Sequence, residues 1–193
     1  MKIGAAYYPE LWPRERWEED ARLMRETGFN TVRLGEFSWS AIEPQPGQYV
    51  WDWLDEAIAL FDKYGIGVVM STPTPTPPKW LCDQFDIYQR DKEGHARGFG
   101  SRRHVCANNP DYLAASAQIA RQVAARYGRK KGVIAWQLDN EYGVHDTIRC
   151  YCSHCREAFR SWLAQKYGTA EALNRAWGTA FWSQNYRDFS EIE

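Results

Sequence analysis

The sequence lacks any long hydrophobic run. No stretch approaches the roughly 20 apolar residues that a membrane-spanning helix needs. The chain opens on Met1-Lys2-Ile3-Gly4, without the basic segment and apolar run of a leader peptide. We therefore expect a cytoplasmic protein without a membrane span, in which the five cysteines are thiols or metal ligands and not disulfides.

The sequence also lacks an excess of charge of either sign. It has 24 Lys and Arg against 25 Asp and Glu, which gives a formal net charge of −1. Binding to nucleic acid or to an anionic membrane surface normally requires a surplus of basic residues. We expect neither kind of partner.

Two catalytic signatures are missing as well. No glycine-rich GxGxxG turn follows the first expected strand, which argues against a dinucleotide-binding fold. No Gly-x-Ser-x-Gly elbow is present, and nothing places a nucleophile beside His104 or His145. A Ser-His-Asp hydrolase is therefore poorly supported.

Aromatic residues, in contrast, are abundant. They make up 15% of the chain, with ten Trp and eleven Tyr. Flat rings either fill a core or cover the apolar faces of sugars, and composition alone favours core filling.

Apolar strand patterns alternate with helical patterns along the whole chain. The expected strands are residues 3–8, 29–34, 66–72 and 133–138, and the expected helices are residues 13–28, 52–64, 79–85, 110–128, 156–167 and 170–177. Residues 87–109 form a long irregular loop, which inside a compact domain is usually functional. This order predicts an α/β fold with a parallel sheet, either doubly wound or a (β/α)8 TIM barrel. A full barrel typically needs roughly 250 residues, so four units are about half of one.

A carboxyl group and an amide follow the fourth expected strand, which we expect to be buried. Ligands bind at this end of parallel strands, and Glu141 is the candidate proton donor for cleaving a sugar bond. Trp136 and Tyr142 could raise its pKa by partial desolvation, and Asn140 could bind a sugar hydroxyl. The alternative is a loop with a helix N-cap.

Other charged residues are weaker candidates. Arg102 or Arg103, in the long loop, could hold the substrate or a carboxylate near the acid, or form a surface ion pair. Glu36 and Glu10 are possible second carboxylates, but for Glu36 a loop cap or a salt bridge to Arg33 or Arg102 is the favoured interpretation, and Glu10 has the same status.

Three cysteines lie within six residues, at Cys150, Cys152 and Cys155. This spacing lets one loop fold its sulfurs onto one ion, and thiolate-rich sites favour zinc over harder ions, with iron as the alternative. Cys106 is the candidate fourth ligand and His154 the runner-up. Four thiolates leave no open position, so we predict a structural zinc site. Unrelated thiols are the alternative.

Five segments together resemble a known family. They are residues 5–13, 33–40, 72–78, 98–103 and 136–143. In combination they are similar to the N-terminal half of a family 42 glycoside hydrolase, a bacterial β-galactosidase, and the resemblance covers essentially the whole chain. It implies a (β/α)8 barrel, of which residues 1–193 would form about the first four units.

The resemblance also implies an activity, the hydrolysis of terminal β-D-galactose residues with retention. It implies that Glu141 is the acid/base and that Asn140 and Arg102 bind the substrate. In zinc-bearing members of the family, the pattern of four thiolates matches Cys106, Cys150, Cys152 and Cys155. The family is commonly trimeric.

One departure from the family matters. The family's nucleophile is a glutamate on the seventh barrel strand, which lies later than the 193 residues here. We therefore expect a β-galactosidase segment that is inactive alone. The alternative, from a different class, is a zinc-binding α/β remnant of a truncated glycosidase with no activity.

Overall fold

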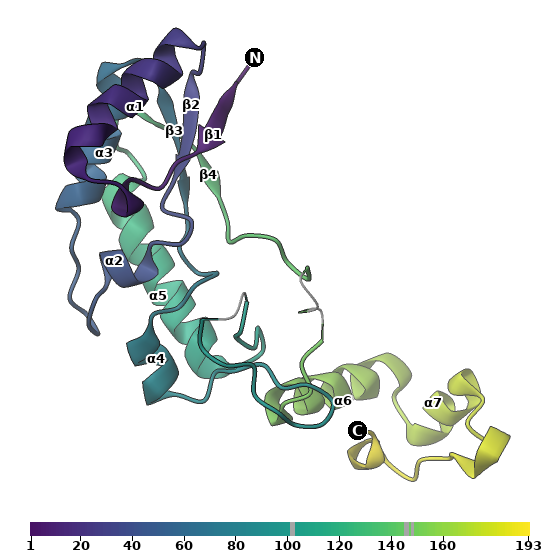
Figure 1. Cartoon of the computed structure of the whole chain (residues 1–193). Helices are drawn as coiled ribbons and strands as arrows, with labels where there is room; N and C mark the ends of the chain where they lie inside the picture. The colour runs from purple at the N-terminus through teal and green to yellow at the C-terminus, as the bar shows by residue number, and fades with distance from the viewer. Residues whose placement is uncertain (101–102, 145–146, 148) are drawn as a thin grey trace.

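Four parallel strands form the centre of the fold in the computed structural model, which describes residues 1–100, 103–144, 147 and 149–193. The strands are β1 (Gly4–Ala6), β2 (Thr31–Leu34), β3 (Gly67–Ser71) and β4 (Val133–Gln137), and they lie in the sheet in that order (Figure 1). All three pairings are parallel. A doubly wound sheet reverses its strand order at a switch point, whereas a barrel adds strands in sequence. The observed order is that of a barrel.

Helices connect the strands and then continue beyond β4. They are α1 (Arg14–Glu26), α2 (Trp39–Ile42), α3 (Asp52–Lys63), α4 (Lys79–Gln84), α5 (Pro110–Tyr127), α6 (Ser153–Tyr167) and α7 (Ala170–Trp177), with 3-10 turns η1 (Pro9–Leu11), η2 (Phe181–Ser183) and η3 (Phe189–Glu191). Except for α2, each helix was expected from the sequence to within a few residues. Within the described part of the chain, none of them is both long and apolar enough to cross a membrane.

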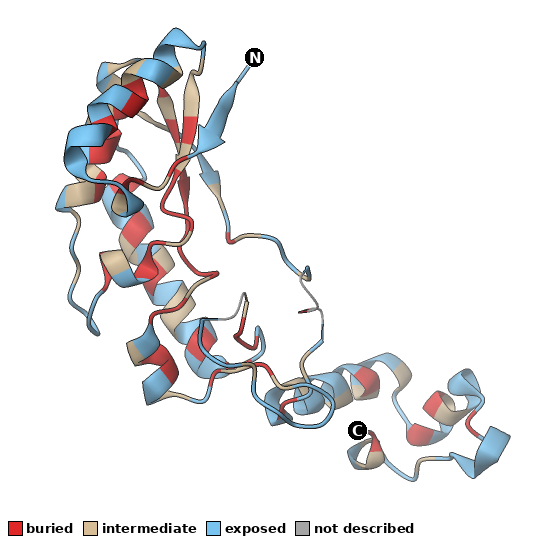
Figure 2. Ribbon diagram, in the orientation of Figure 1, coloured by how far each residue is buried: buried red, intermediate tan, exposed pale blue. Residues whose placement is uncertain are grey.

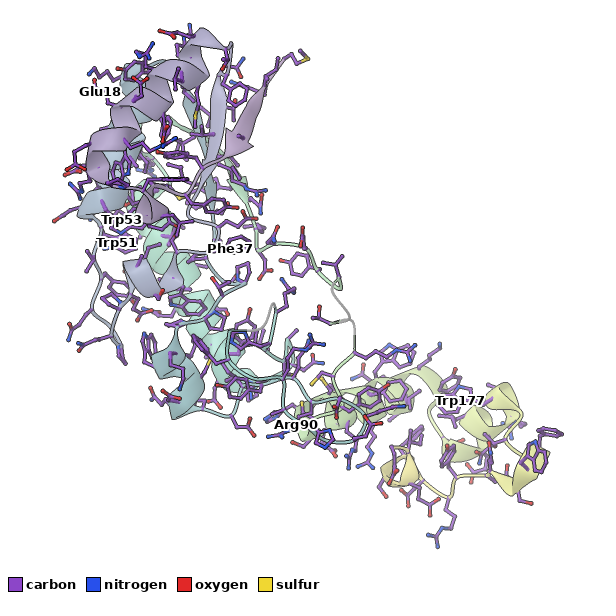
Figure 3. The ribbon with its side chains drawn as sticks, viewed as in Figure 1. Glu18, Phe37, Trp51, Trp53, Arg90 and Trp177 are labelled. Carbon is purple, nitrogen blue, oxygen red and sulfur yellow. The ribbon has the colours of Figure 1, made fainter. Side chains whose placement is uncertain are left out.

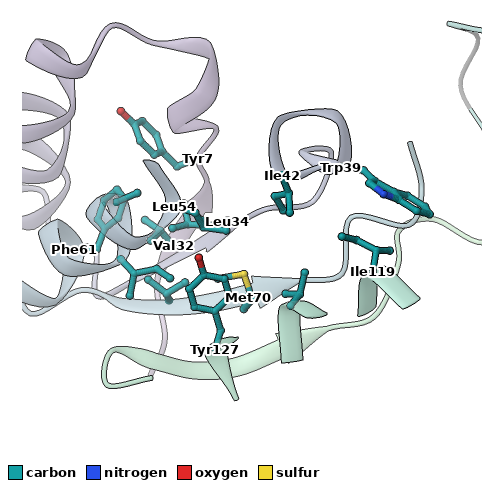
Figure 4. Close-up of a cluster of buried hydrophobic side chains, with 14 of the residues drawn as sticks. Tyr7, Val32, Leu34, Trp39, Ile42, Leu54, Phe61, Met70, Ile119 and Tyr127 are labelled. Carbon is teal, nitrogen blue, oxygen red and sulfur yellow. The ribbon is translucent and has the colours of Figure 1, made fainter. Parts of the chain in front are cut away.

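One face of the sheet packs against α1, α3 and α5. On β2 and β3 the side chains of this face are fully buried, and they are Val32, Leu34, Val68 and Met70. The apolar faces of α3 and α5 supply the other side of this core, with Leu54 and Phe61 from the first and Ile119 and Tyr127 from the second (Figure 4). Because side chains alternate along a strand, the residues between them, such as Arg33 and Val69, lie on the opposite face. That opposite face leads to the polar groups described below.

The expectation that the fourth strand is buried is wrong. Ile134 is 46% exposed, Trp136 is 36% exposed and Leu138, just past the strand, is 71% exposed. Within the described residues β4 pairs only with β3, so it is an edge of the sheet. Figure 2 shows β1 and β4, the two edge strands, largely in the colour of exposed residues. An apolar pattern predicts a strand but not whether a neighbour covers it.

Residues 153–193 form a C-terminal arm that extends away from the sheet (Figure 1). The arm has its own small hydrophobic cluster, built on Leu163, Leu173 and Ile192. In this cluster α6 packs against α7 and η3. The arm is therefore a unit beside the main core and not an extension of it.

Candidate active site

Polar side chains gather at the carboxyl ends of β2, β3 and β4. Glu36 follows β2, Thr72 and Thr74 follow β3, and Asp139 follows β4. All four are buried. Parallel strands bring these positions to the same end of the sheet, where the carboxyl ends of the strands lie. Ligands bind at this end in such folds.

Glu36 is held by three hydrogen-bond donors. Its carboxylate accepts hydrogen bonds from Arg33 Nη2 at 2.6 Å, from the Tyr8 hydroxyl at 2.8 Å and from Gln137 Nε2 at 3.2 Å. Burial and the bond to Glu36 raise the pKa of Tyr8. The expected salt bridge between Glu36 and Arg33 is confirmed, and Glu36 fills a structural role at this end of the sheet.

An aromatic ring lies at the same end of the sheet. Phe37 (Figure 3) stacks on Tyr8 with ring centroids 5.8 Å apart and an interplanar angle of 5°. Glu10, the other carboxylate considered from the sequence, accepts a hydrogen bond from the Ser38 hydroxyl. This end of the sheet therefore combines fixed carboxylates with a flat apolar surface.

Asp139 forms the second anchored carboxylate. Arg103 Nη1 donates to its Oδ1 at 2.7 Å, and the Thr74 hydroxyl donates to its Oδ2, also at 2.7 Å. The Asp139 amide donates to Thr72 Oγ1 at 2.8 Å. The sequence indicated that an arginine in this loop could hold a carboxylate near the acid, and Arg103 does so. Nothing in the sequence singled out Asp139 as that carboxylate.

Asn140 and Glu141 follow immediately. The backbone N–H of Asn140 donates to Asp139 Oδ1 at 2.7 Å. Asn140 is half-buried, whereas Glu141 is exposed. Tyr142, one of the two aromatic residues expected to desolvate Glu141, is 71% exposed. Trp136 pairs in register with Met70 and precedes Gln137, so its ring lies on the face opposite the polar network.

Three residues considered from the sequence have other outcomes. Arg102, the expected substrate-binding arginine, and His145 both lie outside the described residues. His104 is buried, with its Nε2 3.6 Å from the sulfur of Cys82. The described part of the chain therefore gives His104 a place in the core.

The four expected metal ligands do come together. The sulfurs of Cys106, Cys150, Cys152 and Cys155 all lie within 4.8 Å of one another. Cys106 Sγ is 3.4 Å from the sulfurs of both Cys152 and Cys155. Zinc–sulfur bonds of about 2.3 Å in a tetrahedron separate the sulfurs by about 3.8 Å. The arrangement therefore fits a zinc ion, and His154 is not among the grouped ligands in the described residues.

Backbone and amide N–H groups surround these sulfurs. Arg90 N–H donates to Cys150 Sγ at 3.4 Å, and Asn108 donates through its backbone to Cys106 and through its side chain to Cys155. The hydrogen bond from Cys106, with that from Arg90, lowers the pKa of Cys150 to about 4. Such donors favour a thiolate at Cys150, the form that binds a metal. The hydrogen bond with Cys150 and burial raise the pKa of Cys106, and burial raises that of Cys155, so these two thiols would release their protons on binding an ion.

Sequentially ordered parallel strands, with carboxylates and an amide at their carboxyl ends, are the arrangement of the (β/α)8 barrel class. The family model of glycoside hydrolase family 42, described as beta-galactosidase, matches residues 6–193. The chain belongs to this family.

Relatives agree with this assignment. A beta-galactosidase of Thermus thermophilus is 57% identical over 192 residues, which are 99% of this chain and 30% of that protein. The crystal structure of a beta-galactosidase from the psychrophilic Marinomonas ef1 superposes with a TM-score of 0.96 at 52% identity, over 100% of this chain and 30% of that one. For the enzyme of the haloarchaeon Halorubrum lacusprofundi the TM-score is 0.97 at 49% identity, over 100% and 29%. The chain spans about 30% of the length of the curated relatives it matches.

The comparisons confirm the expected fold class. The chain has the fold of the N-terminal part of a (β/α)8 barrel. The catalytic domain of a beta-amylase from Paenibacillus polymyxa shares the fold alone, with a TM-score of 0.62 at 18% identity.

Proposed function

We propose that this chain, as the N-terminal part of a glycosidase domain, belongs to a β-galactosidase that hydrolyses terminal non-reducing β-D-galactose residues with retention. One observation carries the proposal. The family match runs over residues 6–193 and includes Asn140 and Glu141, which follow β4 at the edge of the sheet where barrel enzymes bind ligands.

Glu141 is the acid/base in this proposal. It protonates the leaving oxygen of the glycoside and later takes a proton from water. Asn140 binds a sugar hydroxyl, and Arg102 binds the substrate. Phe37 supports a sugar ligand, because its ring, stacked on Tyr8, offers an apolar surface close after the carboxyl end of β2.

The second carboxylate comes from outside these 193 residues. Glu36 and Asp139 are each held by an arginine and a hydroxyl group, which leaves neither suited to attack the sugar. One relative, Gan42B of G. stearothermophilus, is titled a catalytic mutant with alanine for a glutamate numbered later in its own chain than residue 193. We therefore propose that the 193-residue chain is inactive alone.

The experiment is an assay on a chromogenic β-galactoside. The chain alone should give no turnover, and adding the complementary C-terminal portion of a close relative should restore it. Glu141→Gln should then lower kcat by about 100-fold or more, because general acid–base catalysis is lost. Glu15→Gln, at an exposed position on α1, is the matched control. Hydrolysis by the chain alone would contradict the proposal that the second catalytic carboxylate comes from outside these 193 residues.

A structural zinc ion is the second part of the proposal. Cys106, Cys150, Cys152 and Cys155 would hold it, and with four thiolates it would cross-link two loops without touching substrate. A reducing cytoplasm would keep these thiols available as ligands. The trimer implied by the family resemblance stays a prediction.

The second candidate function is an inactive zinc-binding remnant. It is favoured by one observation: the four cysteines assemble in this chain, whereas of the two carboxyl groups that glycoside cleavage uses the chain supplies one candidate, Glu141. If the C-terminal portion of a relative never restores turnover, this candidate is supported over the first.

A further inference from the structure

The turn that follows β4 has an uncommon backbone. Asp139 and Glu141 have φ values of 57° and 46°, in the left-handed region that residues other than glycine rarely adopt. Two such residues, separated only by Asn140, persist where the surrounding structure fixes them. The contacts that fix this turn therefore decide where the Glu141 side chain starts.

The Asp139 carboxylate makes the central contacts. Oδ1 accepts the N–H of Asn140, which ties the side chain to the next peptide, and Oδ2 accepts the hydroxyl of Thr74. Thr74 is itself fixed, because its carbonyl accepts the hydroxyl of the buried Tyr112 at 2.9 Å. The end of β3 thus holds the turn after β4.

Arg103 reaches the same turn from the long loop. It donates to the Asp139 carboxylate and to the backbone carbonyl of Asn140, and its guanidinium lies 5.4 Å from the ring centre of Tyr142. The side chains of Arg103 and Asp139 are only 16% and 12% exposed. A buried carboxylate needs such a partner, because an unpaired charge at this depth is strongly destabilising.

Gln137 fixes a further group of the turn. Its Nε2 donates to the Asp139 carbonyl at 2.9 Å, and its Oε1 accepts from Arg33 Nη1 at 2.8 Å. Both the backbone and the side chain of Asp139 are therefore anchored to β2, β3 and the long loop. The backbone that carries Glu141, two residues later, therefore starts from a fixed position.

We propose that Asp139 is a positioning residue for Glu141. Its carboxylate, charged and paired with Arg103, holds the left-handed turn so that the acid/base enters the site in one orientation. This proposal rests on the proposed role of Glu141. Asp139 itself touches no substrate in this scheme, since all its polar atoms are used within the protein.

The first test measures amide exchange by NMR in the 193-residue chain. Asp139→Asn keeps the shape but removes the charge, and the Asn140 amide should exchange at least about tenfold faster, because a bond to a charged acceptor is lost. Asp52→Asn, exposed at the start of α3, is the control. If Asp139→Asn does not fold, Thr74→Val removes one bond to the carboxylate and should give a smaller increase. Unchanged exchange in these variants would overturn the proposal.

The second test uses the enzyme restored with a C-terminal portion. Asp139→Asn should lower kcat by about 100-fold with little change in KM, because the acid/base is misplaced. Loss of the negative charge should also move the alkaline limb of kcat/KM to lower pH, which a purely structural role would not do. If Glu141→Gln is inactive but Asp139→Asn leaves both kcat and the alkaline limb of kcat/KM unchanged, the positioning role is refuted. If Glu141→Gln stays active, the proposed function fails, and amide exchange alone decides whether Asp139 holds the turn.

Discussion

Tyr112 connects the polar network of the site to the core. It is 6% exposed, and its hydroxyl donates to the Thr74 carbonyl at 2.9 Å. Burial raises its pKa to about 12, and the negative charge of Asp139 adds to the shift. The neutral phenol is therefore part of what holds the end of β3.

This shift predicts a loss of stability in alkali. Between pH 10 and about 12 the unfolded chain loses the Tyr112 proton while the folded protein keeps it. The unfolded state then binds fewer protons, so the free energy of unfolding falls as pH rises through this window. The largest contribution of Tyr112 is about 3 kcal/mol. Urea unfolding at pH 9 and pH 11.5 measures it.

Tyr112→Phe is the matched variant for this prediction. It should lose about 1 kcal/mol at pH 9, where the hydroxyl bond is missing. It should then lose less than the parent chain on going to pH 11.5. Tyr7 and Tyr127 also have raised pKa values through burial, so both proteins decline. Equal declines would contradict the assignment to Tyr112.

The residues of the site were only partly predictable from the sequence. Asn140 and Glu141 stand out because they follow a strand pattern and match a family segment. Asp139 lies in the same segment, but its role was not predictable, because its partner Thr74 is 65 positions away and only folding brings them together. The sequence offered two adjacent arginines, and only the structure assigns Arg103 to Asp139.

At the scale of elements, α5 shows how one side chain starts a helix. The Asn109 side chain accepts the backbone N–H groups of Asp111 and Tyr112 at 2.9 and 3.0 Å, and Pro110 occupies the first helical position. The side-chain Nδ2 of Asn109 also donates to the backbone carbonyl of Asp86 at 3.1 Å. This cap therefore joins the long loop to the helix that places Tyr112.

Removing the cap should weaken the main core. Asn109→Ala should lower the free energy of unfolding by about 1 to 2 kcal/mol, because the helix loses its N-cap and the Asp86 carbonyl loses its donor. Hydrogen exchange should speed up in the first turn of α5. The control is Thr169→Ala, which removes the N-cap of α7 and should affect only the arm. A core that is equally destabilised by both changes would argue against separate units.

Element positions were predictable because they depend on local sequence. The periodic apolar residues and the end signals of α3 and α5 placed both helices to within about a residue. The short helix α2 was missed, since four residues carry too little periodicity to distinguish a helix from a loop. The exposure of β4 was also missed, because burial depends on neighbours that no local pattern describes.

At the scale of the whole molecule, the arm meets the long loop at a junction near the start of α6. Tyr151 N–H donates to the Arg90 carbonyl at 2.9 Å, and Arg90 lies at the base of the arm while Trp177 lies farther along it (Figure 3). The cysteine cluster is at the same junction, with Cys106 on the long loop and the other three ligands at or just before α6. One metal ion there would tie the arm to the loop that carries Arg103.

We therefore predict that metal removal frees the arm before it unfolds the core. Metal analysis should find about one zinc per chain. Chelation, or Cys152→Ser, should speed tryptic cleavage at Arg149 and Arg156, because the junction loses its cross-link, while amide exchange in α3 stays slow. Cys82→Ser, at a buried thiol outside the cluster, should keep its zinc. Metal-free protein with the same cleavage rate as untreated protein would show that the four thiols do not hold the arm.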